Sequence, residues 1–212
     1  MQMTHSGLSV SLDGATSAPI SLEDANSLIA PVGMRIWPLP VAQLPESLDA
    51  QRRAETISAD ARQALLDAYL LPRARLLSLI EEARQRPHVP GGGALTSEVT
   101  THGQTYPQLH CVEAGIDYGR FDHWHRNLAP DGSGTDEVWQ VLWGSGFCVH
   151  QRLPDGRHLA LTLACPRPDQ GWLGTYDGAR PHMGSVASAS IGSKVLVQVI
   201  GPDRWEMLYE DG

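Results

Sequence analysis

The sequence predicts a mainly β protein, in which a sheet-forming C-terminal part follows an N-terminal arm and a helical segment. From residue 94 onward, at least seven short runs of β-favouring residues are separated by turn residues. No helical periodicity lies between these runs, which favours an antiparallel sandwich or barrel. The 21 glycines and 15 prolines of the chain fit a structure with many turns between short strands.

The N-terminal part, residues 1–56, is expected to form an extended arm rather than a separate domain. It is rich in Ser, Ala, Pro and Leu and has no sustained periodicity. SLEDANSLI (21–29) is compatible with a short helix that begins after Ser21 as N-cap. MRIWPLP (34–40) is compatible with a strand or an extended strap anchored by Trp37, and its two prolines exclude a central strand.

Residues 57–89 are predicted to be a helical segment that packs on the barrel. Ser58 is a suitable N-cap, and apolar residues follow it at helical spacing until Pro72 interrupts the run. A second apolar stripe ends near PGGG at 90–93, which marks the predicted start of the β-barrel at residues 90–212. No chemistry is expected of these helices.

Two segments carry turn signals inside the predicted barrel. LPDG (153–156) is flanked by alternating apolar residues, which indicates a hairpin. APDGSG (129–134) indicates a second, longer turn.

Composition excludes several classes of function. The net charge is −8 and no stretch is rich in Lys and Arg, so neither nucleic-acid binding nor membrane-surface binding is expected. No apolar run approaches the roughly 18 residues of a membrane helix, and the N-terminus does not resemble a signal peptide. The three cysteines, Cys111, Cys148 and Cys165, form no CxxC pair, which fits a reducing compartment. We therefore expect a cytoplasmic protein.

A candidate metal site starts from two histidines in YGRFDHWHRN. His123 and His125 are one residue apart, and residues two positions apart on a strand project from the same face. Two convergent imidazoles suit a borderline metal. Glu137 opens the next predicted strand, and an antiparallel neighbour would bring its carboxylate beside both rings.

This arrangement resembles the first motif of the cupin superfamily. The motif combines HxH, a Glu on the following strand and a Gly seven residues later, here Gly144. YDGARPH ends in His182, in a setting similar to the second cupin motif. The resemblance covers about residues 90–212. It implies a jelly-roll barrel with a divalent metal held by His123, His125, Glu137 and His182.

The chain departs from the family pattern at several positions. Eleven residues separate His125 from Glu137, where the family has three or four, and we interpret the extra length as a hairpin insertion. Asp117 stands where the family has a Gly before the first His, and Val186 replaces the Asn expected after the last His.

Further residues are candidates for roles beside the metal. Tyr176 and His110 are candidate proton-transfer groups, and Arg180, in the same predicted loop as Tyr176, is a candidate for orienting an anionic substrate. Phe121 and Trp139 are expected to line the cavity.

The resemblance and the residues together predict a metal-dependent cupin enzyme that acts on a small, oxygen-rich organic substrate. An Fe(II) dioxygenase is favoured, while Zn, Mn or Ni would also suit the donors. The alternatives are a non-redox lyase, isomerase or cyclase that uses a Tyr or His base, and a non-catalytic barrel that binds a small molecule. A homodimer is expected, to which residues 30–45 could contribute by crossing to the partner.

Overall fold

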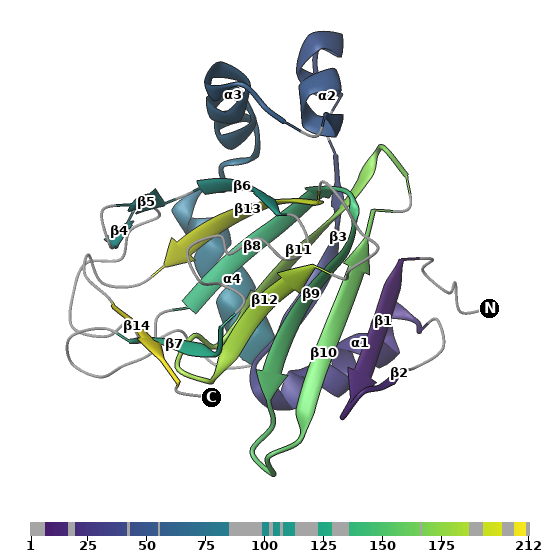
Figure 1. Cartoon of the computed structure of the whole chain (residues 1–212), viewed down its shortest axis with the longest axis vertical. Coiled ribbons are helices and arrows are strands. Elements are labelled where there is room, and N and C mark those ends of the chain that lie inside the picture. The colour runs from purple at the N-terminus through teal and green to yellow at the C-terminus, as the bar shows by residue number, and fades with distance from the viewer. Residues whose placement is uncertain are drawn as a thin grey trace.

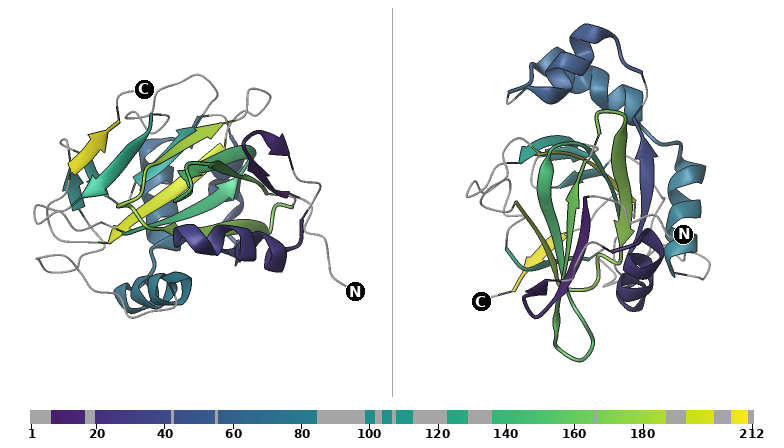
Figure 2. Two further views of the ribbon diagram at one scale, coloured as in Figure 1. Left: turned by 90° about the horizontal axis from the view of Figure 1, so that it is seen from below. Right: turned by 90° about the vertical axis from the view of Figure 1, so that its right-hand side faces the viewer.

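The computed structural model describes residues 7–16, 20–41, 43–54, 56–84, 99–101, 104–106, 108–112, 123–128, 136–165, 167–186, 193–200 and 206–210. Over these residues the chain forms two antiparallel sheets that face each other, with helices at their outer face and ends (Figures 1 and 2). The helices are α1 (Leu22–Ile29), α2 (Glu46–Arg53), α3 (Ala59–Tyr69) and α4 (Arg73–Arg84), and a 3-10 turn covers Ala30–Val32. None of the helices in this described part has the length and apolar character that crossing a bilayer requires.

The larger sheet has seven strands. Their order is β14 (Glu206–Tyr209), β7 (His125–Leu128), β12 (His182–Val186), β9 (Ser145–Arg152), β10 (His158–Ala164), β1 (Leu8–Leu12) and β2 (Ala15–Thr16). The second sheet has the order β3 (Arg35–Pro40), β11 (Gln170–Tyr176), β8 (Asp136–Trp143), β13 (Ser193–Ile200) and β6 (Gln108–Val112). A separate hairpin joins β4 (Val99–Thr101) and β5 (Gln104–Tyr106).

The chain passes back and forth between the two sheets, as in a jelly roll. From β7 to β14 only β9 and β10 are consecutive strands of one sheet, and every other step changes sheet. At the step from β8 to β9, Gly144 has a φ of 99°, a conformation that favours glycine. The predicted fold class is therefore confirmed as a mainly β, cupin-like jelly roll, in which the described strands form a two-layer sandwich rather than a closed barrel.

The hairpin prediction at LPDG is also confirmed. β9 and β10 pair antiparallel around it, the Gly156 N–H donates to the Leu153 carbonyl at 2.9 Å, and Gly156 has a φ of 85°. The turn expected at 129–134 lies outside the described residues.

Residues 1–56 differ from the extended arm that the composition predicts. β1 pairs with β10 and with β2, and β3 pairs with β11, so this part of the chain contributes two strands to the seven-stranded sheet and one to the five-stranded sheet. α1, N-capped by Ser21 as predicted, lies between β1 and β3 (Figures 1 and 2). Its buried Ala25 and Ile29 belong to the apolar core between the sheets.

β3 is the edge strand that its prolines predict. Its outer side is occupied at Ile36, where the Asn26 side chain forms two backbone hydrogen bonds. Asn26 Nδ2 donates to the Ile36 carbonyl at 3.0 Å, and the Ile36 N–H donates to Asn26 Oδ1 at 2.9 Å. Residues 35–40 thus pair with β11 of the same chain on one side and contact Asn26 of the same chain on the other.

Two helices of the predicted segment 57–89, α3 and α4, pack on the sandwich, and residues 85–89 lie outside the described residues. Ser58 N-caps α3 by accepting from the Ala61 N–H, and the chain turns at Pro72 into α4. α4 covers the outer face of the five-stranded sheet, where its apolar side chains contact Val138 and Leu173. Because Val138 faces these helices, its neighbours Glu137 and Trp139 face the other sheet.

Gly174 is required by the packing of Trp139. The two residues are opposite each other on β11 and β8, and a Cβ at Gly174 would overlap the six-membered ring of Trp139. We expect Gly174→Ala to lower the free energy of unfolding by about 1–3 kcal/mol, because the added methyl group would overlap a buried ring that cannot move aside freely.

Urea unfolding of Gly174→Ala, Trp139→Leu and the double variant tests this explanation. The double variant should lose less stability than the sum of the two single variants, since removal of the ring also removes the overlap. Additive losses would contradict it.

Candidate functional site

A row of residues crosses the seven-stranded sheet and faces the interior. Tyr209 lies opposite His125, His125 opposite His182, and His182 opposite Gln151. Opposite residues of antiparallel strands project from the same face of the sheet. His125, His182 and Gln151 are 2%, 1% and 0% exposed, so this part of the row lies in the core.

The five-stranded sheet contributes a carboxylate and a phenol. Glu137 on β8 lies opposite Tyr176, the last residue of β11, and both side chains are buried. The Tyr176 hydroxyl hydrogen-bonds to the Glu137 carboxylate. The Tyr176 ring centroid is 4.5 Å from that of His182, which brings the two sheets' polar groups together.

Asn127 connects these groups. Its Nδ2 donates to Glu137 Oε2 at 2.9 Å and lies 3.4 Å from His182 Nε2. The ring centroids of His125 and His182 are 4.3 Å apart. We call His125, Asn127, Glu137, Tyr176 and His182 the interior polar cluster.

The backbone fixes which nitrogen of each histidine carries the proton. His125 Nδ1 is 2.7 Å from the His123 carbonyl, and His182 Nδ1 is 2.7 Å from the Arg180 carbonyl. Because a carbonyl oxygen can only accept, each Nδ1 carries the proton and each Nε2 keeps its lone pair. Burial lowers the pKa of both rings, which favours this neutral form. A neutral histidine whose Nδ1–H donates to a backbone carbonyl is suited to binding a metal through Nε2.

Burial shifts the pKa of Glu137 in the opposite direction, which again favours the neutral form. Desolvation raises the pKa of its carboxyl to about 7, and the hydrogen bonds from Tyr176 and Asn127 offset only part of this rise. Both of these partners are uncharged. A cation beside Glu137 would stabilise its ionised form.

His123 lies outside the interior polar cluster, which differs from the sequence prediction. β7 begins at His125, so His123 precedes the strand and does not share the inward face with His125; its side chain is exposed. The residue two positions along β7 from His125 is Asn127, which is buried. Sequence reasoning missed Asn127, although strand alternation from His125 identifies it.

The structure distributes the remaining candidate residues differently. Tyr176 ends a strand rather than lying in a loop, and Trp139 is buried with its ring centroid 6.0 Å from that of Phe147. Arg180 is half-buried in the turn before β12, and its Nε lies 3.7 Å from Asp177 Oδ2. His110 lies on β6, which β13 separates from β8, and its side chain is outside the described residues. Phe121 is also outside them.

The donor chemistry of the cluster fits a divalent metal. Two imidazole nitrogens and one carboxylate form a mixed N/O set that suits Fe, Mn, Ni or Zn. Buried beside them, Asn127 Oδ1 has no hydrogen-bond partner within the described ranges of the chain. In the described part of the chain, however, no three His, Cys, Asp or Glu side chains are already arranged around a common metal position. The Asn127 amide nitrogen lies between two of the donors instead.

A second pair of histidines lies on the outer face of the seven-stranded sheet. His150 Nδ1 is 2.8 Å from His158 Nε2, and His150 Nε2 is 2.6 Å from Ser185 Oγ. Burial and the neighbouring His158 lower the pKa of His150 to about 4. His150 is therefore neutral, and this hydrogen-bonded pair is separate from the interior polar cluster.

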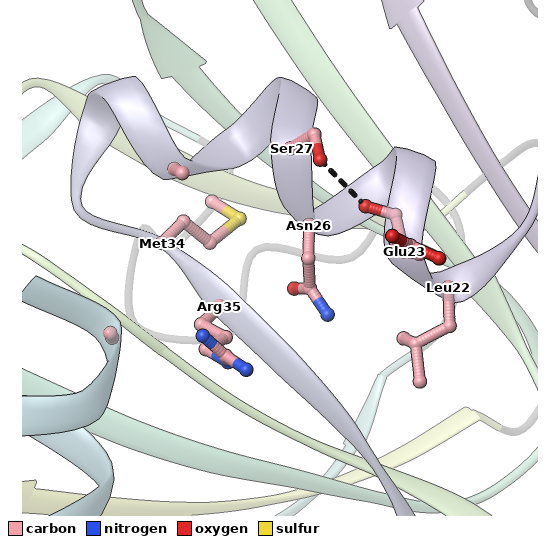
Figure 3. Close-up of a pocket in the computed structure, with 8 residues that line it drawn as sticks. Leu22, Glu23, Asn26, Ser27, Met34 and Arg35 are labelled. Atoms are coloured by element: carbon pink, nitrogen blue, oxygen red, sulfur yellow. Dashed lines mark hydrogen bonds between the residues drawn. The ribbon is translucent and has the colours of Figure 1, made fainter. Parts of the chain in front are cut away.

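The structure also has a groove of about 690 Å³ beside α1. Leu22, Glu23, Asn26, Ser27, Met34 and Arg35 line it together with Ala30 and Ala83 (Figure 3). None of these residues belongs to the interior polar cluster, so the groove is not part of this site.

The raised pKa of Glu137 predicts a pH-dependent stability in metal-free protein. Between pH 4.5 and about 7 the folded protein holds a proton that the unfolded chain releases, so the contribution of Glu137 to stability falls as the pH rises. Glu137→Gln removes this loss. The free energy of unfolding of the variant, relative to the wild type, should therefore increase by about 3 kcal/mol from pH 4 to pH 8.

Urea unfolding in the presence of a chelator measures this difference. The lowered pKa values of the buried histidines make stability rise with pH, which is the opposite direction. Because the variant and the wild type share these histidines, their contribution cancels when the two proteins are compared at each pH. Glu206→Gln, at an exposed carboxylate on β14, is the matched control. Parallel pH profiles for Glu137→Gln and the wild type would refute the assignment.

Comparisons with known proteins identify the fold. No family model matches the chain, and no curated protein matches its sequence. Among solved structures, the chain is similar to acireductone dioxygenase from Bacillus anthracis, whose structure has a cadmium ion in its active centre. The TM-score is 0.58 and the sequence identity 11%, over 96% of this chain and 98% of that one. That protein is an enzyme of the cupin fold. The likeness supports the cupin-like fold that the strand topology shows.

Proposed function

We propose that this protein is a metal-dependent enzyme of the cupin fold that acts on a small, oxygen-rich organic substrate, with an Fe(II) dioxygenase favoured. The observation that carries the proposal is the pair of Nδ1 hydrogen bonds to backbone carbonyls at His125 and His182. These bonds leave two Nε2 lone pairs in the core, in the same cluster as the buried Glu137 carboxylate. We infer that His125, Glu137 and His182 hold the metal.

The similar structure supports the metal-dependent class, since it is a dioxygenase with a divalent ion in its active centre. A bound Fe(II) ion would supply oxygen activation, and a non-redox divalent ion would supply polarisation of a carbonyl or enolate.

The chain's own residues supply the other functions that such an enzyme needs. The amide N–H groups of Gln151 and the indole N–H of Trp139 are buried donors that have no hydrogen-bond partner in the described part of the chain. Such groups are unfavourable unless a ligand satisfies them, and oxygen atoms of a substrate would do so. Tyr176, hydrogen-bonded to Glu137, is placed to hold or move a proton beside His182.

The position of Tyr176 also favours a second candidate, a non-redox lyase, isomerase or cyclase. In that reaction class a Tyr base takes a proton from a C–H bond next to a polarised carbonyl. A third candidate, a non-catalytic barrel that binds a small molecule, needs neither the metal nor Tyr176.

Metal content tests the proposal. The full-length protein, purified without chelator or added metal, should contain about one equivalent of a divalent metal by elemental analysis. His125→Ala and Glu137→Ala should lose it, because each removes a proposed donor. His123→Ala, at an exposed histidine in the adjacent turn, is the matched control and should retain it.

The identity of the metal then separates the candidate reactions. If the metal is iron, the next experiment is an oxygen-uptake assay with small diketones and catechols. If it is zinc, manganese or nickel, the next experiment is a solvent proton-exchange assay. Absence of metal in the wild type, together with correct folding of both variants, would refute the metal-dependent function and leave the non-catalytic barrel.

A further inference from the structure

Asn127 occupies the place where two lone-pair donors converge. Its amide nitrogen lies 2.9 Å from Glu137 Oε2 and 3.4 Å from His182 Nε2. His182 Nε2 is an acceptor, because the Arg180 carbonyl fixes the proton on Nδ1. A single NH₂ group, with two N–H bonds and a partial positive charge, thus faces two acceptors as a cation would.

The other half of the same amide is unsatisfied. Asn127 is 0% exposed, and its Oδ1 has no hydrogen-bond partner among the residues that the structure describes. Buried polar atoms are nearly always hydrogen-bonded, so an orphaned carbonyl oxygen next to potential metal donors needs an explanation.

A half-turn about the Cβ–Cγ bond would exchange these two atoms. The oxygen and nitrogen of a carboxamide are almost equal in size, so the exchange needs no additional space. In the metal-free protein with Glu137 ionised it is unfavourable, because Oδ1 would then face two other acceptors. The preference reverses when a cation lies between the three groups, since all three can then donate lone pairs to it.

We propose that Asn127 supplies the fourth protein donor of the metal site, with its amide nitrogen turned inward in the metal-free protein and its amide oxygen turned inward when a divalent metal binds. The inference rests on the proposed metal-dependent function. It assigns to Asn127 the place that the HxH pattern suggested for His123.

The geometry of β7 supports Asn127 over His123 for this role. His125 and Asn127 are both buried, and the residue between them, Arg126, is exposed, as strand alternation requires. His123 precedes the strand and has an exposed side chain, and its carbonyl is used to hold the His125 ring. The resulting donor set is two imidazoles, a carboxylate and an amide oxygen.

Co²⁺ binding to the chelator-treated, full-length protein tests the proposal without an activity assay. Visible absorption reports both the affinity and the ligand set of a bound Co²⁺ ion. Asn127→Leu keeps the approximate volume but has no donor. It should weaken Co²⁺ binding by about ten- to a hundred-fold and change the visible spectrum. His123→Ala, the matched control, should change neither.

A second variant keeps the test decisive if Asn127→Leu does not fold. Asn127→Asp retains an oxygen at the same place, so it should bind Co²⁺ at least as tightly as the wild type. A purely structural Asn127 predicts instead that Asp and Leu both weaken binding, because both remove the amide that donates to Glu137.

The outcomes separate this inference from the proposed function. If the wild type binds Co²⁺, His125→Ala abolishes binding and Asn127→Leu binds like the wild type, the metal site stands and the role of Asn127 is refuted. Loss of binding in His123→Ala would also refute it. If the wild type does not bind Co²⁺ at all, both proposals fall.

Discussion

The desolvation of the Glu137 carboxyl group between the two sheets is the constraint on which the interior of this protein depends. Water cannot solvate this group, and its hydrogen-bond donors, Tyr176 and Asn127, are neutral. The two imidazoles of the same cluster do not neutralise the charge of Glu137. Their Nδ1 atoms donate to backbone carbonyls, and burial keeps both rings uncharged. The ionised form of Glu137 therefore has no counter-charge in the interior polar cluster, and a cation beside it would supply one.

The jelly-roll connectivity is what brings these groups together. The seven-stranded sheet supplies the two histidines, Asn127 and Gln151, and the five-stranded sheet supplies Glu137 and Tyr176. The chain changes sheet between β7 and β8 and again at Gly144, so donors that follow one another in sequence are placed on opposite walls of the sandwich. Helix α4, on the outer face of the second sheet, supports the strand that carries Glu137.

The sequence predicts features set by local backbone chemistry. The cap at Ser58, the turn at LPDG and the edge position of β3 follow from residues whose preferences act within a few positions. The strand β11 was not predicted. In β11, Gly171 and Gly174 interrupt the β pattern, and they are required there by Val141 and Trp139 on the neighbouring strand.

The difference between His123 and Asn127 has a similar origin. Every second residue of a strand faces inward, so a two-residue uncertainty in where β7 begins decides whether the inward pair is His123 and His125 or His125 and Asn127. The pattern HxH cannot specify that beginning, which is set by the pairing of β7 with β12 and β14. The sequence does predict Glu137 and His182 as members of one cluster, although not the neutral amide between them.

The division of the interior polar cluster between the two sheets has a consequence for folding. His125 and His182 are paired across 57 positions of chain, and Glu137 reaches them only from the opposite wall. Such long-range contacts are completed late, after the loops that separate them have closed. A folding intermediate with one formed sheet would therefore lack the cluster. Any ligand of the cluster would bind the native state alone, and its concentration would set the melting temperature of the whole sandwich.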